Sequence, residues 1–153
     1  MKKFKFKLEK VLLQREINLE LAQKDFSEIM KIKNDEEEIL SKMINSKEEA
    51  KSQSVKLIET TKDWVLQVDQ INRYLAGQDL RIKNQNERLM KIEKLVESRR
   101  EILQQKATEV KILERLKEKQ QREYVEEVNK KEQAEIDEMA VIRFARNDSL
   151  LKD

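Results

Sequence analysis

The chain contains almost none of the residues that form tight turns. Across 153 residues it has no proline and one glycine, Gly77. A compact domain reverses direction many times, and glycine and proline supply many of the backbone conformations that tight reversals require. The sequence therefore excludes a compact α/β domain and predicts very few reversals of the chain.

The composition is compatible with two structural classes, a protein of long helices and a disordered chain. Charged residues make up 42% of the chain, compared with about 25% in ordinary globular domains. The net charge is only +2, so self-repulsion is weak. Disordered chains usually combine low hydrophobicity with high net charge and lack periodic apolar residues. The spacing of the apolar residues therefore decides between the two classes.

Two stretches carry apolar residues at coiled-coil spacing. Steps of four and three residues from Leu8 give a first seam, at Leu12, Arg15, Leu19, Ala22, Phe26, Ile29, Lys33, Glu36, Leu40, Met43, Lys47 and Ala50. A second seam is carried by Ile82, Leu89, Ile92, Val96, Leu103, Val110 and Leu113, and it resumes after a polar interval at Tyr124, Ala134 and Val141. Seams of comparable strength can cover each other when two helices pack side by side.

The predicted fold class is all-α, a long two-helix antiparallel coiled-coil hairpin with the second helix longer than the first. We expect a first helix over about 6–52, a reversal at about 53–61, a second helix over about 62–146 and a frayed tail at 147–153. The whole of 1–153 is expected to form a single coiled-coil rod. Thr60 and Asp63 resemble a capping pattern at the start of the second helix. Gly77 is the alternative position for the reversal, although a helix tolerates one glycine at a cost of about 1 kcal/mol.

Two features of this hairpin predict exposed apolar surface. The longer second helix overhangs the first, which leaves its C-terminal apolar stripe without an internal partner and available for docking. At the other end, Phe4 and Phe6 alternate with lysines ahead of the first helix, as an exposed apolar handle. We expect no signal peptide here, because a continuous apolar core and a cleavage site are missing.

The residue inventory argues against catalysis. The chain has no cysteine or histidine and no glycine-rich phosphate loop, so it has no redox site or thiolate metal site and lacks the usual proton shuttle and a nucleotide-binding loop. Carboxylates cluster at 35–38 and 135–138, but solvated helix faces carry such clusters routinely. We predict a non-enzyme with no cofactor and no metal. We also expect no nucleic-acid partner, because acidic and basic residues interleave, and at most a peripheral membrane contact through the N-terminal lysines.

Three segments together resemble one family. F-K-F-K-L-E-K-V-L-x-x-R from Phe4 to Arg15 and Q-A-E-I-D-E-M-A-V-I-R-F-A-R from Gln133 to Arg146 are similar to the terminal segments of FliJ proteins of the bacterial flagellar type III export apparatus. The stretch I-N-R-Y-L, with a later Ile82, is similar to that family's aromatic segment after the helix reversal.

The resemblance implies a function as well as a fold. It implies a two-helix stalk similar to the gamma subunit of rotary ATP synthases. Such a stalk docks in the hexameric ring of the export ATPase FliI, promotes ring assembly and ATP turnover, and links the ring to the export gate protein FlhA. The resemblance also implies an association with substrate chaperones. The implied location is the cytoplasmic face of the inner membrane at the flagellar base.

The same resemblance implies contact roles for two groups of residues in this sequence. The group implied to contact the ATPase ring is Phe4, Phe6, Leu8, Leu12, Arg15, Gln133, Asp137, Glu138, Ala140 and Arg143. The group implied to contact the export gate is Tyr74, Leu75, Gln78 and Ile82, with Gln78 standing where the family pattern leads us to expect leucine. The alternatives are a homodimeric structural coiled coil and the stalk of a virulence-type secretion system.

Overall fold

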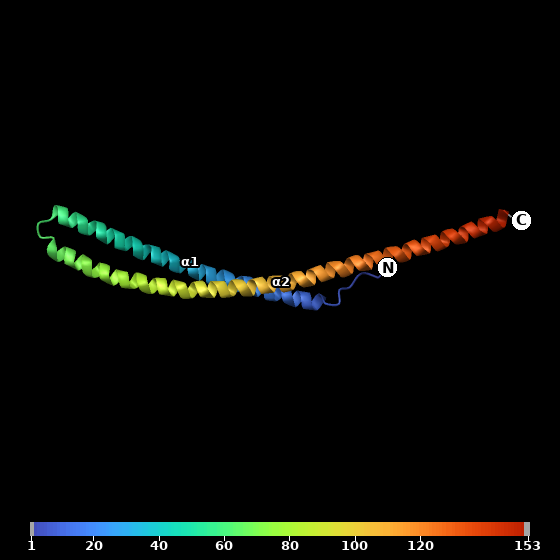
Figure 1. The fold of residues 1–153 in the computed structure, drawn as a ribbon, viewed down its shortest axis with the longest axis horizontal. Coiled ribbons are helices and arrows are strands. Elements are labelled where there is room, and N and C mark those ends of the chain that lie inside the picture. The colour runs from blue at the N-terminus through green and yellow to red at the C-terminus, as the bar shows by residue number, and fades with distance from the viewer. Residues whose placement is uncertain (1, 152–153) are drawn as a thin grey trace. The chain divides into compact units, whose positions relative to one another are not determined.

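The protein is described by a computed structural model over residues 2–151. These residues form two α-helices, α1 (Glu9–Thr60) and α2 (Val65–Leu151), of 52 and 87 residues, and no strand occurs in this described range. The helices pack against each other as a hairpin, with α2 the longer helix (Figure 1). The predicted fold class is thereby confirmed.

The reversal occupies residues 61–64, so it overlaps the predicted interval of about 53–61 only at residue 61 and lies mostly beyond it. Helix α1 continues to Thr60, beyond the expected end near residue 52. The hydroxyl of Thr60 donates to the carbonyl oxygen of Lys56 (2.7 Å), so this threonine closes α1 and does not start α2, contrary to the predicted capping pattern. Within residues 2–151 no residue has a positive φ. The turn therefore needs no glycine, and Gly77 lies inside α2.

The end of α2 also differs from the expectation. The sequence predicted a frayed tail over 147–153, whereas α2 continues to Leu151; residues 152 and 153 lie outside the described part. The prediction took poor apolar spacing as a sign of fraying. Neither proline nor glycine interrupts the helix here, and the backbone bonds of a helix do not require a packed face.

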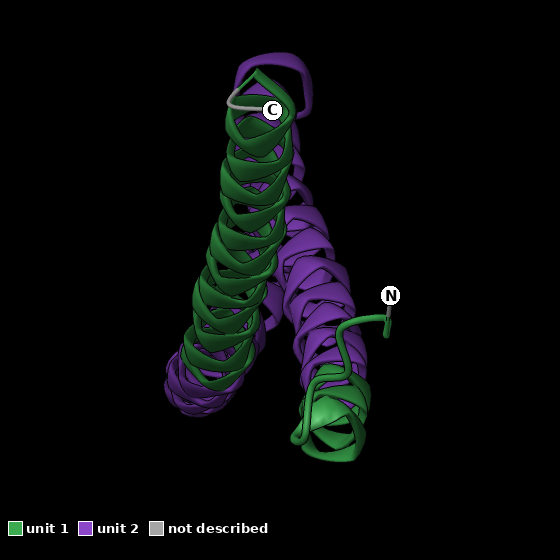
Figure 2. Ribbon diagram, turned by 90° about the vertical axis from the view of Figure 1, so that its right-hand side faces the viewer, with its two compact units in different colours: residues 1–18, 107–153 green, residues 19–106 purple. Residues whose placement is uncertain are grey.

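The described chain separates into two compact units, coloured separately in Figure 2. We call residues 19–106 the hairpin unit and residues 1–18 with 107–153 the terminal unit. The expectation of one continuous rod stays a prediction.

The hairpin unit is built on the two predicted seams. Ile29 of α1 packs with Ile92 and Val96 of α2, and Phe26 and Met30 extend this cluster. Each of the three central side chains is buried. Burying such a side chain contributes about 1.5–3 kcal/mol, which makes this cluster a main source of stability for the hairpin unit.

Polar residues on the seam of the hairpin unit are paired across the helices. The Gln85 amide donates to the carbonyl oxygen of Glu36 (3.0 Å) and to its carboxylate (2.6 Å), while Arg88 forms an ion pair with the same carboxylate (3.1 Å). The amide of Gln78 donates to the carbonyl oxygen of Met43 (3.0 Å). These bonds satisfy polar groups that interrupt the apolar seam, and they fix the register of α1 against α2.

The terminal unit corrects the expectation of an exposed handle at residues 4–8. Phe6 is 7% exposed, and the Phe4 ring lies 5.8 Å from the Tyr124 ring. The Tyr124 hydroxyl donates to the carbonyl oxygen of Lys2. We call residues 2–8 the strap. The two aromatic side chains of the strap are covered because α2 extends past the first residue of α1 and offers them a surface, whereas the lysines and Leu8 stay exposed. Seam spacing alone does not reveal this contact.

Candidate partner-binding surfaces

The last part of α2 has no covering element among the described residues. Every residue from 129 to 151 is exposed. Within this C-terminal extension, Ile136, Met139, Ala140 and Phe144 share one helix face at i, i+3, i+4 and i+8 spacing, and we call these four residues the C-terminal stripe. Ile136, Met139 and Phe144 are 59%, 62% and 75% exposed. An exposed apolar stripe of this kind is typical of a protein-interaction surface.

Polar groups border and interrupt the C-terminal stripe. Arg143 and Asn147 line a shallow hollow together with the four apolar residues. Beside it, the Gln133 amide donates to the Asp137 carboxylate (3.0 Å), one turn along the helix. This arrangement combines apolar anchors with an arginine and a carboxylate, which is a common composition for the centre and rim of an interface.

The structure gives the C-terminal residues predicted for the ATPase ring different positions. Gln133, Asp137, Glu138, Ala140 and Arg143 are all exposed. Ala140 and Arg143 lie on the stripe face, Gln133 and Asp137 lie along its edge, and Glu138 lies on the opposite side of the helix. The sequence-based set omitted Ile136, Met139 and Phe144. Their helical spacing within the quoted Gln133–Arg146 segment was the signal that could have identified them.

The N-terminal residues predicted for the ring pack inside the terminal unit. Phe6 and Leu12 are buried, Phe4 is half-buried, and Leu8 is exposed. The Arg15 guanidinium pairs with Glu109 (3.3 Å), and Lys117 pairs with Glu9 (2.9 Å). The main role of this group in the described structure is to hold α1 and the strap on α2.

The two predicted groups do not form one patch. The strap contacts α2 at Tyr124, which precedes Asp137 by about four helical turns, or about 20 Å at 1.5 Å per residue. The terminal unit therefore presents a packed N-terminal group and, farther along α2, an uncovered C-terminal group.

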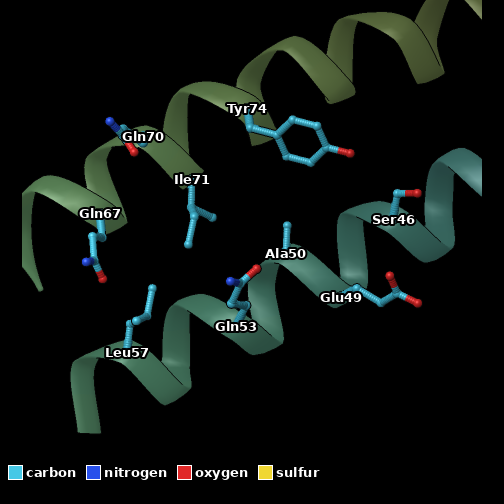
Figure 3. Close-up of a pocket in the computed structure, with 9 residues that line it drawn as sticks. All are labelled: Ser46, Glu49, Ala50, Gln53, Leu57, Gln67, Gln70, Ile71 and Tyr74. Atoms are coloured by element: carbon cyan, nitrogen blue, oxygen red, sulfur yellow. The ribbon is translucent and has the colours of Figure 1, made fainter. Parts of the chain in front are cut away.

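A third surface lies near the reversal in the hairpin unit. Here α1 and α2 leave a cleft of about 540 Å³, into which Ala50 and Leu57 of α1 and Ile71 and Tyr74 of α2 project (Figure 3). Glutamines at 53, 67 and 70 supply most of its polar groups. The cleft offers a partner both apolar contacts and amide hydrogen bonds.

Of the four residues predicted to contact the export gate, one lines this cleft and three lie in the interface between the helices. Tyr74 lines it and is 42% exposed. Leu75 and Ile82 are half-buried on the helix interface. Gln78 is 4% exposed and its amide bonds to Met43, so a partner reaches this side chain only if the helices separate.

The described residues contain neither a cluster of metal-ligating side chains nor a membrane-spanning helix. Over 2–151, no three or more His, Cys, Asp or Glu side chains gather closely enough to hold a metal ion. In the same range, neither helix contains a stretch that is long and apolar enough to cross a membrane.

Comparison with known proteins gives one match. The family described as "Flagellar FliJ protein" matches residues 4–149. No curated protein and no solved structure matches the chain. Since the family match runs across both helices and nearly the whole sequence, the chain belongs to the flagellar FliJ protein family.

Proposed function

We propose that this flagellar export-related protein is the central stalk of the export ATPase ring. Proteins of its family are non-catalytic components of flagellar export and associate with the export apparatus. The more specific proposal is that the C-terminal extension enters the ring of the hexameric ATPase FliI, favours assembly of the ring and raises its rate of ATP hydrolysis.

The observation that carries this proposal is the uncovered C-terminal stripe. A single helix with its side chains is about 10–12 Å across, which suits insertion into the centre of a ring. The apolar residues of the stripe supply buried anchors, while Arg143 and Asp137 supply charges at defined positions. In this proposal the strap packs on α2 ahead of the C-terminal extension, and it contacts the ring at most through Phe4 and Leu8.

The first test is the ATP hydrolysis rate of the purified export ATPase with and without the full chain. The wild type is expected to stimulate ATP hydrolysis. The double variant Met139→Ser/Phe144→Ser should bind the ATPase about tenfold more weakly, as judged from the chain concentration that gives half-maximal stimulation, because it loses two exposed apolar side chains. These side chains are exposed, so the variant should keep the wild-type circular dichroism.

Val141→Ser is the matched control for this test. Val141 is 68% exposed, lies on the same extension and faces away from the stripe. It is expected to stimulate as the wild type does. Absence of stimulation by the wild type would reject the stalk proposal, and equal losses in both variants would reject the assignment to the stripe.

We further propose that the cleft near the reversal contacts the export gate protein FlhA. Support comes from Tyr74, which is the exposed aromatic residue of the cleft, whereas Leu75, Gln78 and Ile82 contribute by holding the helices beneath it. Tyr74→Ala should weaken binding to the soluble domain of FlhA by tenfold or more in a direct titration. Leu80→Ser, at an exposed apolar site outside the cleft, should leave binding unchanged, and the opposite ranking would contradict the assignment.

These two surfaces give the stalk its proposed place at the flagellar base, on the cytoplasmic side of the inner membrane. A contact with chaperones of export substrates belongs to the same proposal. In cells, we expect both FliI and FlhA to co-purify with the tagged chain. Met139→Ser/Phe144→Ser should lose FliI and retain FlhA, whereas Tyr74→Ala should lose FlhA and retain FliI.

A further inference from the structure

Between residues 132 and 147 the C-terminal extension carries its charges in two blocks, with Lys130 and Lys131 before them and Asp148 after them. From 132 to 142 the charged residues are all acidic, Glu132, Glu135, Asp137 and Glu138, and from 143 to 147 they are both basic, Arg143 and Arg146. The apolar stripe lies across the boundary between these blocks. A helix with this polarity is complementary to a copy of itself that runs in the opposite direction.

The charges also lie on the correct side of the helix for such pairing. At about 100° per residue, Glu132 falls between Ile136 and Met139, and Arg146 falls about 20° beyond Met139, so both charges lie toward the Met139 side of the face that also holds Ala140. In a two-fold antiparallel helix pair, equivalent flanks of the two copies meet. Glu132 of each copy then approaches Arg146 of the other, and the pair forms twice.

We propose that the C-terminal extension pairs with a second copy of this chain as an antiparallel helix pair, with its two-fold axis between Met139 and Ala140. In this register, Met139 faces the small Ala140 of the other copy, so that large and small side chains interlock at the centre. Ile136 faces the aliphatic stem of Arg143, whose charge reaches the solvent at the edge. Ile136, Met139 and Ala140 of the stripe become the core of the dimer.

The parallel arrangement is disfavoured by the same residues. Parallel pairing brings Arg143 against Arg143 and Glu132 against Glu132, and like charges placed directly opposite destabilise a helix pair. The contact is also short, because 129–150 spans only about 30 Å at 1.5 Å per residue. Interfaces at the low end of the size range are typical of transient complexes, so the dimer is expected to form reversibly at micromolar concentration.

Pairing covers the stripe that the proposed function assigns to the ATPase ring. If that proposal holds, dimerisation and ring entry exclude each other, and the dimer is a reserve form that protects the exposed apolar residues. The self-association itself does not depend on the stalk function, and it is tested with the purified chain alone.

The decisive test is sedimentation equilibrium of the full chain at low ionic strength. The wild type is expected to shift from monomer to dimer as its concentration rises. Glu132→Arg and Arg146→Glu should each weaken association by about tenfold, because each converts two attractive pairs into two repulsive ones. The double variant should restore association, since it exchanges the two charges and recreates both pairs.

Two controls complete the test. Glu127→Arg reverses an exposed charge on the opposite face of α2, half a turn from Ile136, and should associate as the wild type does. The chain lacks cysteine, so a single Ala140→Cys variant should form an interchain disulfide, whereas Asn147→Cys should not, because its two copies lie about 22 Å apart in this register.

Three results would overturn the inference: a wild type that stays monomeric, a double variant that fails to recover, or cross-linking of Asn147→Cys as fast as Ala140→Cys. The outcome is separate from that of the ATPase assay. If the chain is monomeric and still stimulates the ATPase, the dimer proposal is rejected and the stalk proposal stands. If the chain dimerises but does not affect the ATPase, the stalk proposal is rejected and the dimer proposal stands.

Discussion

In the hairpin unit, polar residues on the helix interface find partners on the facing helix, whereas in the C-terminal extension apolar residues remain exposed. Gln85 and Arg88 both bond to Glu36 across the hairpin, while Met139 and Phe144 face solvent. Both regions belong to long, charged helices with similar composition. The difference indicates that the hairpin unit provides stability, whereas the extension presents uncovered apolar surface.

The difference between the two regions is tested most directly by truncating one apolar residue in each. Ile29→Ala removes a buried side chain from the Ile29–Ile92–Val96 cluster and should lower the free energy of unfolding by about 2–3 kcal/mol. Ile136→Ala on the C-terminal stripe should change it by less than about 0.5 kcal/mol. Urea unfolding followed by circular dichroism measures both, and equal losses would show that the extension is not free.

A second test concerns the polar residues of the interface. Glu36→Ala removes the carboxylate shared by Gln85 and Arg88 and should destabilise the protein by about 1–2 kcal/mol. Glu38→Ala breaks only an exposed pair with Lys42 and should cost less than about 0.5 kcal/mol. A double-mutant cycle of Glu36→Ala with Gln85→Ala isolates their coupling. If the two effects simply add, the bond between these side chains contributes nothing to stability.

The seam positions were predictable because coiled-coil packing leaves a repeating pattern in the sequence. Along α1, the residues from Leu12 to Ala50 on the predicted seam are buried or half-buried, including the polar residues Lys33 and Glu36. The reversal was less accessible to prediction, since it uses residues 61–64 in ordinary backbone conformations and leaves Gly77 in a helix. A turn without special residues has little sequence signature.

The candidate surfaces were predictable only in part. An unpaired stripe on a longer second helix followed from the predicted position of the reversal, and helical spacing could have identified Met139 and Phe144 within it. How far these two side chains are uncovered follows only from the structure. The covered state of Phe6 and the interior bond of Gln78 depend on which surface faces each residue. Spacing identifies a helix face, but it does not identify what that face meets.

A smaller effect is expected from two aromatic residues near the ends of the chain, of which one is packed and the other exposed. Phe4→Ala removes the ring that contacts Tyr124 and should weaken docking of the strap by about 0.5–1.5 kcal/mol. Tryptic cleavage after Lys5 and Lys7 should then become faster, because the strap detaches more often. Phe144→Ala is the matched control at an exposed aromatic residue and should leave that cleavage rate unchanged. Unchanged cleavage in Phe4→Ala would contradict a docked strap.

The smallest expected effect is at Gly77, and it has the opposite sign. This residue lies inside α2 with a helical φ, and an added Cβ would meet no atom within 4 Å. Gly77→Ala should therefore raise the free energy of unfolding by about 0.5–1 kcal/mol, since alanine loses less backbone entropy in a helix. Urea unfolding measures the gain, with Ala76→Gly as the reverse control. If Gly77→Ala instead destabilised the protein, the chain would have to bend at this position, contrary to the continuous helix α2.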